Sequence, residues 1–178
     1  MLNDNKKFIT LKVDGFKPIK VKVKEDGTMA FYNEYKMLLA EDIVEYKIQN
    51  DNGTIVLISN DNRYFVFGRY SELILEGEIF DKWRDSIRAF LLSDNMFNTF
   101  LNLKEEDFKC TPFIDDCLKI LRRNIEDKLA NDKSLTDEEQ QKEENELFNM
   151  IVNKIASSDP DLLKPAIEYL NSGRELNI

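Results

Sequence analysis

The chain has 178 residues, 42% of them hydrophobic, which is enough to build the core of a folded domain. Its 25 basic and 34 acidic residues give a formal net charge of -9, which disfavours binding to nucleic acid through the whole surface. The chain has no histidine, which excludes Ser-His-Asp and Cys-His catalysis and histidine metal sites. We therefore expect no catalytic site, no metal site, no cofactor and no nucleic-acid partner.

The first 77 residues have the pattern of short antiparallel strands. Five of the six glycines lie in this region, between short runs of β-branched and aromatic residues. Because the connections are short, the simplest topology is a meander, in which each strand pairs with the next. Seven strands are predicted, near residues 7–14, 18–24, 28–33, 43–49, 54–59, 63–68 and 71–76.

The second predicted strand shows the alternation most clearly. Residues 19–24 read Ile-Lys-Val-Lys-Val-Lys, which predicts a buried apolar face and a solvated face of lysines. Residues 25–27, Glu-Asp-Gly, then predict a three-residue hairpin loop with Gly27 in the left-handed conformation.

From residue 78 the apolar side chains change to helical spacing. Phe80, Trp83, Ile87, Phe90 and Leu91 recur at steps of three and four, which predicts an amphipathic helix that ends near residue 93. An apolar stretch over residues 96–103 follows, and we expect it to pack between the two halves of the chain.

The remainder of the chain predicts about three helices. Thr111 and Pro112 are typical of a helix start, and Thr136 with Glu139 forms a capping-box pattern at the start of a second helix. A last helical segment is expected after Pro160 and should end at Gly173. We therefore expect two domains, residues 1–100 and residues 101–178.

Seven strands followed by a helix with a tryptophan in its first half resemble the pleckstrin-homology (PH) domain. The resemblance covers about residues 7–95, and the rhythm of residues 40–67 is similar to that of bacterial PH-like domains. It implies a partly open barrel of two orthogonal sheets, with the helix plugging one end and Trp83 buried against the sheet. The predicted fold class is α+β: a seven-stranded antiparallel PH-like β-barrel capped by a C-terminal helix, followed by a helical appendage of about three helices.

The resemblance also implies a candidate anion site. PH domains that bind phosphoinositides carry basic residues beside the loop between strands one and two, and here Lys12, Lys17, Lys20 and Lys22 flank that loop. The alternative is that these lysines only keep an outer strand face solvated. Phe16, at the tip of the loop, either inserts into a membrane interface or folds back into the barrel.

The remaining residues that could take part in chemistry are three acidic runs and two cysteines. The acids at 105–107, 115–116 and 137–146 are expected to be solvated helix faces, because acids near helix starts complement the helix dipole. Cys110 and Cys117 are interpreted as free thiols, with Cys117 packed on an apolar stripe and Cys110 the more exposed of the two.

These patterns favour a non-catalytic protein-interaction or assembly module that binds a protein partner, or a second copy of itself, through its helical stripes. The alternative is an adaptor that binds anionic membrane or phosphoinositide through the basic first hairpin. The chain has no apolar run long enough to span a membrane, and a cytoplasmic location is the default expectation. Its richness in Asn, Lys and Ile suggests a low-GC bacterium or its phage or mobile elements. The candidate partner-binding residues are Phe97, Phe100, Leu147, Phe148 and Ile151.

Overall fold

The computed structural model describes residues 8–172, and the chain divides into two compact units, residues 1–82 and residues 83–178. The sequence placed a boundary at residue 100 instead, which would group the helix after the strands with the sheet. That assignment of independent domains stays a prediction.

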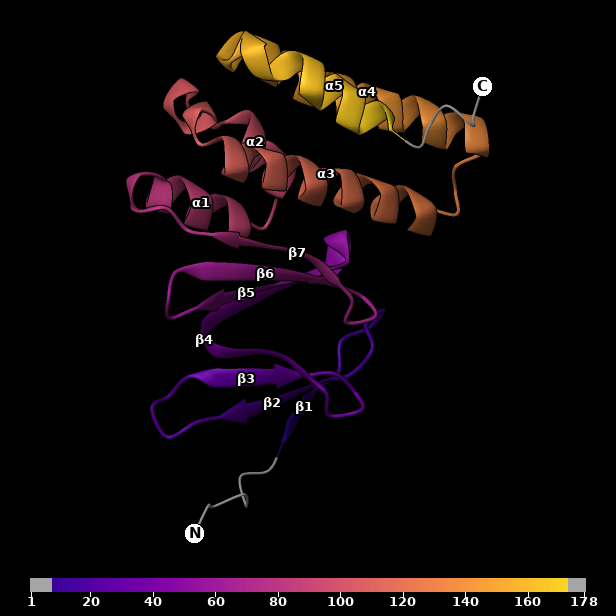
Figure 1. The fold of residues 1–178 in the computed structure, drawn as a ribbon. Helices are drawn as coiled ribbons and strands as arrows, with labels where there is room; N and C mark the ends of the chain where they lie inside the picture. The colour runs from indigo at the N-terminus through magenta and orange to yellow at the C-terminus, as the bar shows by residue number, and fades with distance from the viewer. Residues whose placement is uncertain (1–7, 173–178) are drawn as a thin grey trace. The chain divides into compact units, whose positions relative to one another are not determined.

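The first unit is a seven-stranded antiparallel meander, as predicted (Figure 1). Each strand pairs with its neighbours in chain order, so the sheet runs from β1 to β7 without a crossover. Within residues 8–172, β1 and β7 each pair on one side only, so the partly open PH-like barrel stays a prediction. The strands are β1 (Ile9–Leu11), β2 (Ile19–Val23), β3 (Met29–Tyr32), β4 (Leu38–Gln49), β5 (Thr54–Ser59), β6 (Arg63–Gly68) and β7 (Leu73–Glu78).

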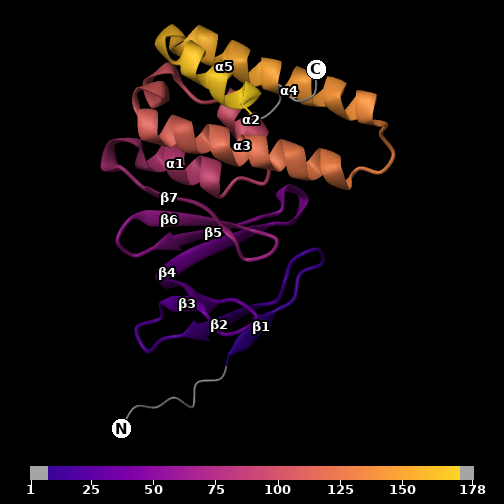
Figure 2. The same ribbon diagram turned by 45° about the vertical axis from the view of Figure 1, so that its right-hand side comes forward.

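The long strand β4 joins two layers of the sheet. Figures 1 and 2 show β1–β3 on one side of it and β5–β7 on the other. The pairing of β4 with β5 shifts register between Ile43 and Glu45, and Asp42 has a φ of 60°. A bulge of this kind bends a strand, so one end of β4 can pair with β3 and the other with β5. The sheet therefore folds over an apolar core made by Ile19, Val21, Phe31, Ala40, Ile43, Ile55, Leu57 and Phe67.

The alternation predicted for β2 is confirmed at Ile19 and Val21, which are buried, while Lys20 and Lys22 are half-buried on the other face. Val23 is an exception, because it ends the strand beside the turn and 42% of its surface is exposed. The predicted left-handed glycine in that turn is confirmed, since Gly27 has a φ of 87°.

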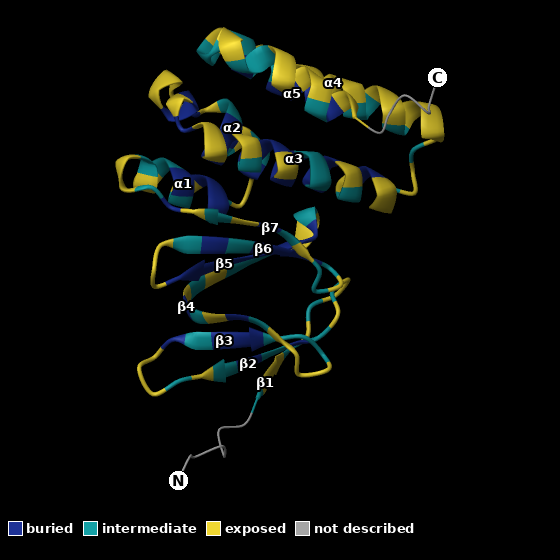
Figure 3. Cartoon of the chain, viewed as in Figure 1, coloured by how far each residue is buried: buried dark blue, intermediate teal, exposed yellow. Residues whose placement is uncertain are grey.

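The second unit is helical, as expected for the C-terminal region (Figure 1). Figure 3 shows buried positions along the whole of α3, whereas the first half of α4 is exposed. Edge-to-face aromatic pairs, Phe90 with Phe113 and Phe100 with Phe108, lie in its core. The helices are α1 (Arg84–Leu91), α2 (Met96–Leu101), α3 (Thr111–Asn131), α4 (Asp137–Ser158) and α5 (Leu163–Asn171), with short 3-10 turns at Asp81–Trp83, Glu105–Lys109 and Pro160–Leu162.

The helix starts follow the sequence signals closely. The capping box of α4 is present: Glu139 N–H donates to Thr136 Oγ1 at 3.1 Å, and Thr136 N–H donates to Glu139 Oε1 at 3.1 Å. Pro165 lies within the first turn of α5, where a backbone N–H has no partner inside the helix to lose. The predicted end at Gly173 lies outside the described residues.

The expectation of a buried Trp83 is wrong. Its side chain is half-buried, and the indole Nε1–H donates to the backbone oxygen of Glu106 at 3.1 Å. The reason is local geometry: Trp83 ends a 3-10 turn, where the side chains advance by about 120° per residue, so it is out of phase with the helix that follows. The buried stripe of α1 consists of Ile87, Phe90 and Leu91.

None of the helices between residues 8 and 172 combines the length and the apolar character needed to cross a bilayer.

Candidate functional site

The four lysines of the predicted anion site lie on the β1–β2 hairpin. Lys12 and Lys17 are exposed in its loop, and Lys20 and Lys22 are half-buried on β2. Within residues 8–172, none of the four side chains has an acidic partner. The hairpin therefore carries cationic charge that the described part of the protein does not neutralise.

Lys22 and Lys24 show the two environments that a lysine finds on this sheet. The ammonium of Lys22 lies 4.4 Å from the centre of the Phe8 ring, a cation–π contact. Lys24 instead pairs with Glu41 at 3.2 Å and with Asp42 at 3.3 Å. Hydrogen bonds to these two carboxylates raise the pKa of Lys24.

The loop between β1 and β2 is fastened to two other turns by Arg69. The guanidinium of Arg69 donates to the backbone oxygens of Gly15 at 3.4 Å and Asn50 at 2.9 Å, and Lys17 N–H donates to the backbone oxygen of Arg69 at 2.7 Å. The guanidinium carbon also lies 4.9 Å from the centre of the Phe16 ring. Phe16 is half-buried against the core of the sheet, so of its two predicted positions the folded-back one is observed.

Large apolar side chains are exposed at two turns of the sheet unit. Tyr35 and Met37, between β3 and β4, are 76% and 64% exposed, Leu38 at the start of β4 is 51% exposed, and the β6–β7 turn exposes Tyr70. The β3–β4 turn has a fixed shape, because Oδ1 of Asn33 accepts from the backbone N–H groups of Tyr35 and Met37. Sequence reasoning missed this surface because it treated the turns only as strand connections.

The candidate partner-binding residues fall into two groups. Phe100, Phe148 and Ile151 are buried in the core of the helical unit, with at most 4% of their surface exposed. Phe97 and Leu147 are half-buried, so part of each side chain faces solvent. The apolar stripes that contain the first three residues are used for packing within this chain.

Both cysteines are buried free thiols, so the expectation of an exposed Cys110 is wrong. Cys110 immediately precedes α3, and its side chain turns inward with that of Phe113. Burial raises the pKa of the Cys110 thiol, and burial raises the pKa of the Cys117 thiol well above its ordinary value. Neither thiol has the depressed pKa that a reactive cysteine needs.

The acidic runs are solvated, with one exception at Asp107. Asp107 is 6% exposed, and its Oδ2 accepts from the backbone N–H of Lys104 at 2.8 Å, which satisfies the start of a 3-10 turn. Within residues 8–172, no three Cys, Asp or Glu side chains are arranged to hold a metal ion.

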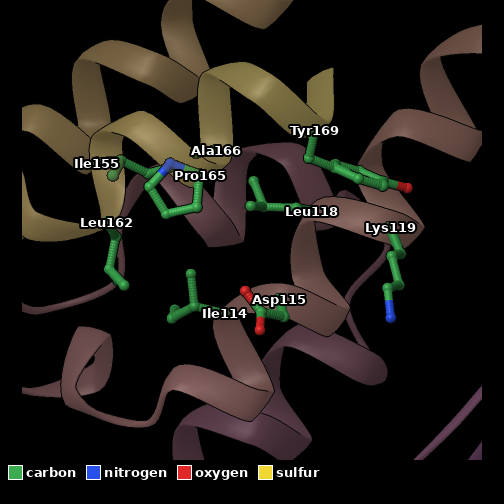
Figure 4. A pocket seen from close by; sticks show the side chains of 9 residues that line it. All are labelled: Ile114, Asp115, Leu118, Lys119, Ile155, Leu162, Pro165, Ala166 and Tyr169. Carbon is green, nitrogen blue, oxygen red and sulfur yellow. The ribbon is translucent and has the colours of Figure 1, made fainter. Parts of the chain in front are cut away.

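The helical unit has a pocket at the contact of α3, α4 and α5 (Figure 4). Its volume is about 130 Å³, and its lining is mainly apolar, with Asp115, Lys119 and Tyr169 as the polar members. In Figure 4 Asp115 lies beside Ile114, whereas Lys119 and Tyr169 lie to the right of the apolar lining residues, with the Lys119 amino group and the Tyr169 hydroxyl directed away from them. The apolar lining residues are Ile114, Leu118, Ile155, Leu162, Pro165 and Ala166.

Arg122 fixes one wall of this pocket. It donates to the backbone oxygen of Tyr169 at 2.8 Å, to Ser172 Oγ at 2.8 Å and to the backbone oxygen of Ser172 at 2.6 Å. Its guanidinium carbon also lies 5.0 Å from the centre of the Tyr169 ring, and its Nε donates to Glu126 at 2.9 Å. Burial raises the pKa of Tyr169, so its hydroxyl stays protonated at neutral pH.

A second, wider groove lies between α4 and α5. Its volume is about 290 Å³; Phe148, Val152, Ile167 and Leu170 supply apolar surface, and three asparagines, Asn145, Asn149 and Asn171, supply amide groups. No charged side chain contributes to its lining.

No protein-family model matches the chain, and comparisons with curated proteins and with solved structures found no match. The PH-like resemblance therefore rests on the strand order alone.

Proposed function

We propose that the chain is a non-catalytic protein-interaction module. The observation that carries this proposal is the pocket between α3, α4 and α5, which is lined mainly by apolar side chains and has a cation and an anion in its lining. Its volume of about 130 Å³ is below the roughly 300–1,000 Å³ typical of small-molecule sites and suits a single side chain of a partner. The exposed Tyr35, Met37 and Leu38 give the sheet unit a second surface of the kind that protein partners cover.

Affinity capture from the source cells, followed by reconstitution with the purified partner, tests this proposal. Pro165→Glu places a charge in the apolar lining at an exposed helical position, so it should reduce partner binding at least about tenfold without unfolding α5. Lys164→Glu is the matched control, since it changes charge one residue away and outside the pocket. Equal binding by both variants would contradict a docking role for the pocket.

A second candidate function is an adaptor for anionic membrane or phosphoinositide. It is favoured by the four lysines Lys12, Lys17, Lys20 and Lys22, none of which has an acidic partner within residues 8–172. Sedimentation with vesicles that contain or lack anionic lipid separates the two functions. The adaptor function is supported if the protein binds anionic vesicles and if this binding is lost in high salt and on replacing Lys12 and Lys17 by Gln. If the protein does not pellet with anionic vesicles at low salt, the adaptor function is wrong.

A further inference from the structure

The size and lining of the pocket between α3, α4 and α5 restrict what can fill it. An engineered cavity of about 150 Å³ with apolar walls holds one benzene molecule, so a pocket of about 130 Å³ has room for one leucine-sized side chain. Ile114, Leu118 and Ala166 are buried in its wall, so the part of the occupant that enters must be apolar.

The charged residues of the lining further restrict which groups the pocket can bind. Asp115 and Lys119 lie one helical turn apart on α3, and both are exposed. Within residues 8–172 neither side chain has a hydrogen-bond or ion-pair partner, although their spacing would allow them to pair with each other. Lys119 can therefore bind an anionic group, and Asp115 can accept from an N–H group, when an occupant brings them.

We propose that this pocket binds the C-terminal residue of a partner protein, with an apolar side chain inside the cavity and the terminal carboxylate on Nζ of Lys119. A chain end is the place in a polypeptide where a carboxylate and a side chain are attached to the same Cα, so both reach a site of this size together. The backbone N–H of that last residue donates to Asp115. The proposal rests on the proposed function, since it names the partner chemistry of the same pocket.

The wall beside Lys119 is already ordered for this role. Arg122 binds backbone carbonyls at the C-terminal end of α5 and lies against the Tyr169 ring, so the position of this ring in the lining is fixed before any ligand arrives. A site whose walls are fixed in advance loses less entropy on binding.

Titration of the full chain with short peptides, followed by amide chemical shifts, tests the proposal. The probe is acetyl-Gly-Ser-Gly-Leu with a free carboxylate, and its controls are the same peptide with a C-terminal amide, a version that ends in Ser, and free L-leucine. We expect the free-carboxylate Leu peptide to shift the amides of pocket residues and to bind at least about tenfold more tightly than each control, the difference of about 1.4 kcal/mol that one lost charge-assisted contact gives.

Substitutions then test whether Lys119 binds the terminal carboxylate of the peptide. Lys119→Gln should remove the preference for carboxylate over amide, and Lys128→Gln, an exposed lysine of the same helix outside the pocket, should leave it unchanged. Equal affinity for the carboxylate and the amide, equal or tighter binding of free leucine, or shifts confined to another surface would each overturn the proposal. If the peptide fails while Pro165→Glu still abolishes capture of a protein partner, the proposed function stands and only the C-terminal chemistry is wrong.

Discussion

At Gly15 both the backbone conformation and a neighbouring side chain disfavour a Cβ atom. Gly15 has a φ of 86°, and a Cβ atom there would lie 2.6 Å from Nη1 of Arg69, the guanidinium that links three turns of the sheet. Gly15→Ala must therefore adopt a left-handed conformation and also displace Arg69. We expect a loss of about 2–4 kcal/mol in the free energy of unfolding, measured by urea denaturation.

Gly27→Ala is the matched control for this substitution. Gly27 has nearly the same φ, 87°, but nothing lies within 4 Å of the position its Cβ would take. Only the backbone cost of about 1–2 kcal/mol should remain. If the two variants lose equal stability, the Arg69 side chain moves away from the added methyl group without a measurable cost.

Phe90 in α1 and Trp83, in the 3-10 turn before α1, give a second comparison. Phe90 is fully buried, so Phe90→Ala should cost about 3–5 kcal/mol. Trp83→Phe keeps an aromatic ring at a half-buried position and loses the indole hydrogen bond to the backbone oxygen of Glu106, so it should cost under about 1.5 kcal/mol. Urea denaturation of both variants measures the difference. A larger loss from Trp83→Phe than from Phe90→Ala would mean that the indole, and not the phenyl ring, anchors this helix.

The burial of Cys110 and Cys117 predicts how the thiols react. Because burial raises both pKa values, a thiol reagent such as DTNB should modify neither cysteine in the native protein at pH 8 and both after unfolding in guanidinium. Rapid modification of one thiol under native conditions would show that Cys110 is accessible after all.

The sequence predicted the environment of some residues and not of others. The left-handed glycine of the β2–β3 turn was predicted, because an Asp-Gly pair favours a turn whatever the rest of the chain does. The contacts of Arg69 were not, since its partners Gly15 and Asn50 are 54 and 19 residues away in the chain. Trp83 was misplaced because its spacing fits an α-helix but the backbone there forms a 3-10 turn.

At the scale of elements, the start of α4 depends on pH. Hydrogen bonds from Thr136 lower the pKa of Glu139 below its ordinary value of 4.5. A carboxyl whose pKa is lower in the folded than in the unfolded state stabilises the fold above its unfolded pKa, and this stabilisation is lost as the pH falls through the folded pKa. We expect the stability difference between the wild type and Glu139→Gln to shrink as the pH falls below about 4.5.

Glu138→Gln is the control for this pH dependence, because it removes a neighbouring charge from the same exposed turn and leaves the hydrogen bonds between Thr136 and Glu139 in place. Thermal melts of the three proteins between pH 3 and pH 7 measure the effect. If the stability difference between the wild type and Glu139→Gln is constant across this pH range, the Glu139 carboxylate does not stabilise the start of α4.

Strand and helix prediction succeeded where local signals were strong. The seven strands, their order, and the capped start of α4 follow from glycine-bounded runs and a capping box. The first half of β4 was missed, since Ala40, Glu41 and Asp42 belong to residue types that are depleted in strands. Their strand conformation depends on pairing with β3, which no local pattern encodes.

At the scale of the whole molecule, charge is unevenly distributed between the two units. Residues 83–178 contain 13 basic and 20 acidic residues, against 12 and 14 in residues 1–82. The candidate sites follow this division. The four lysines that lack an acidic partner among residues 8–172 lie on the sheet unit, and the pocket with one cation and one anion lies in the acidic helical unit. The lysines were identified from the sequence, but the pocket was not, because its walls come from three helices that only the tertiary fold brings together.

The central claim is that a protein partner binds at the pocket between α3, α4 and α5. Photo-crosslinking in the source cells tests it most directly, with benzoylphenylalanine in place of the exposed Pro165 at the pocket, and in place of the exposed Lys128 on α3 as the control. We expect one dominant protein adduct from position 165 that is absent from position 128. The same adducts from both positions, or none from position 165, would contradict it.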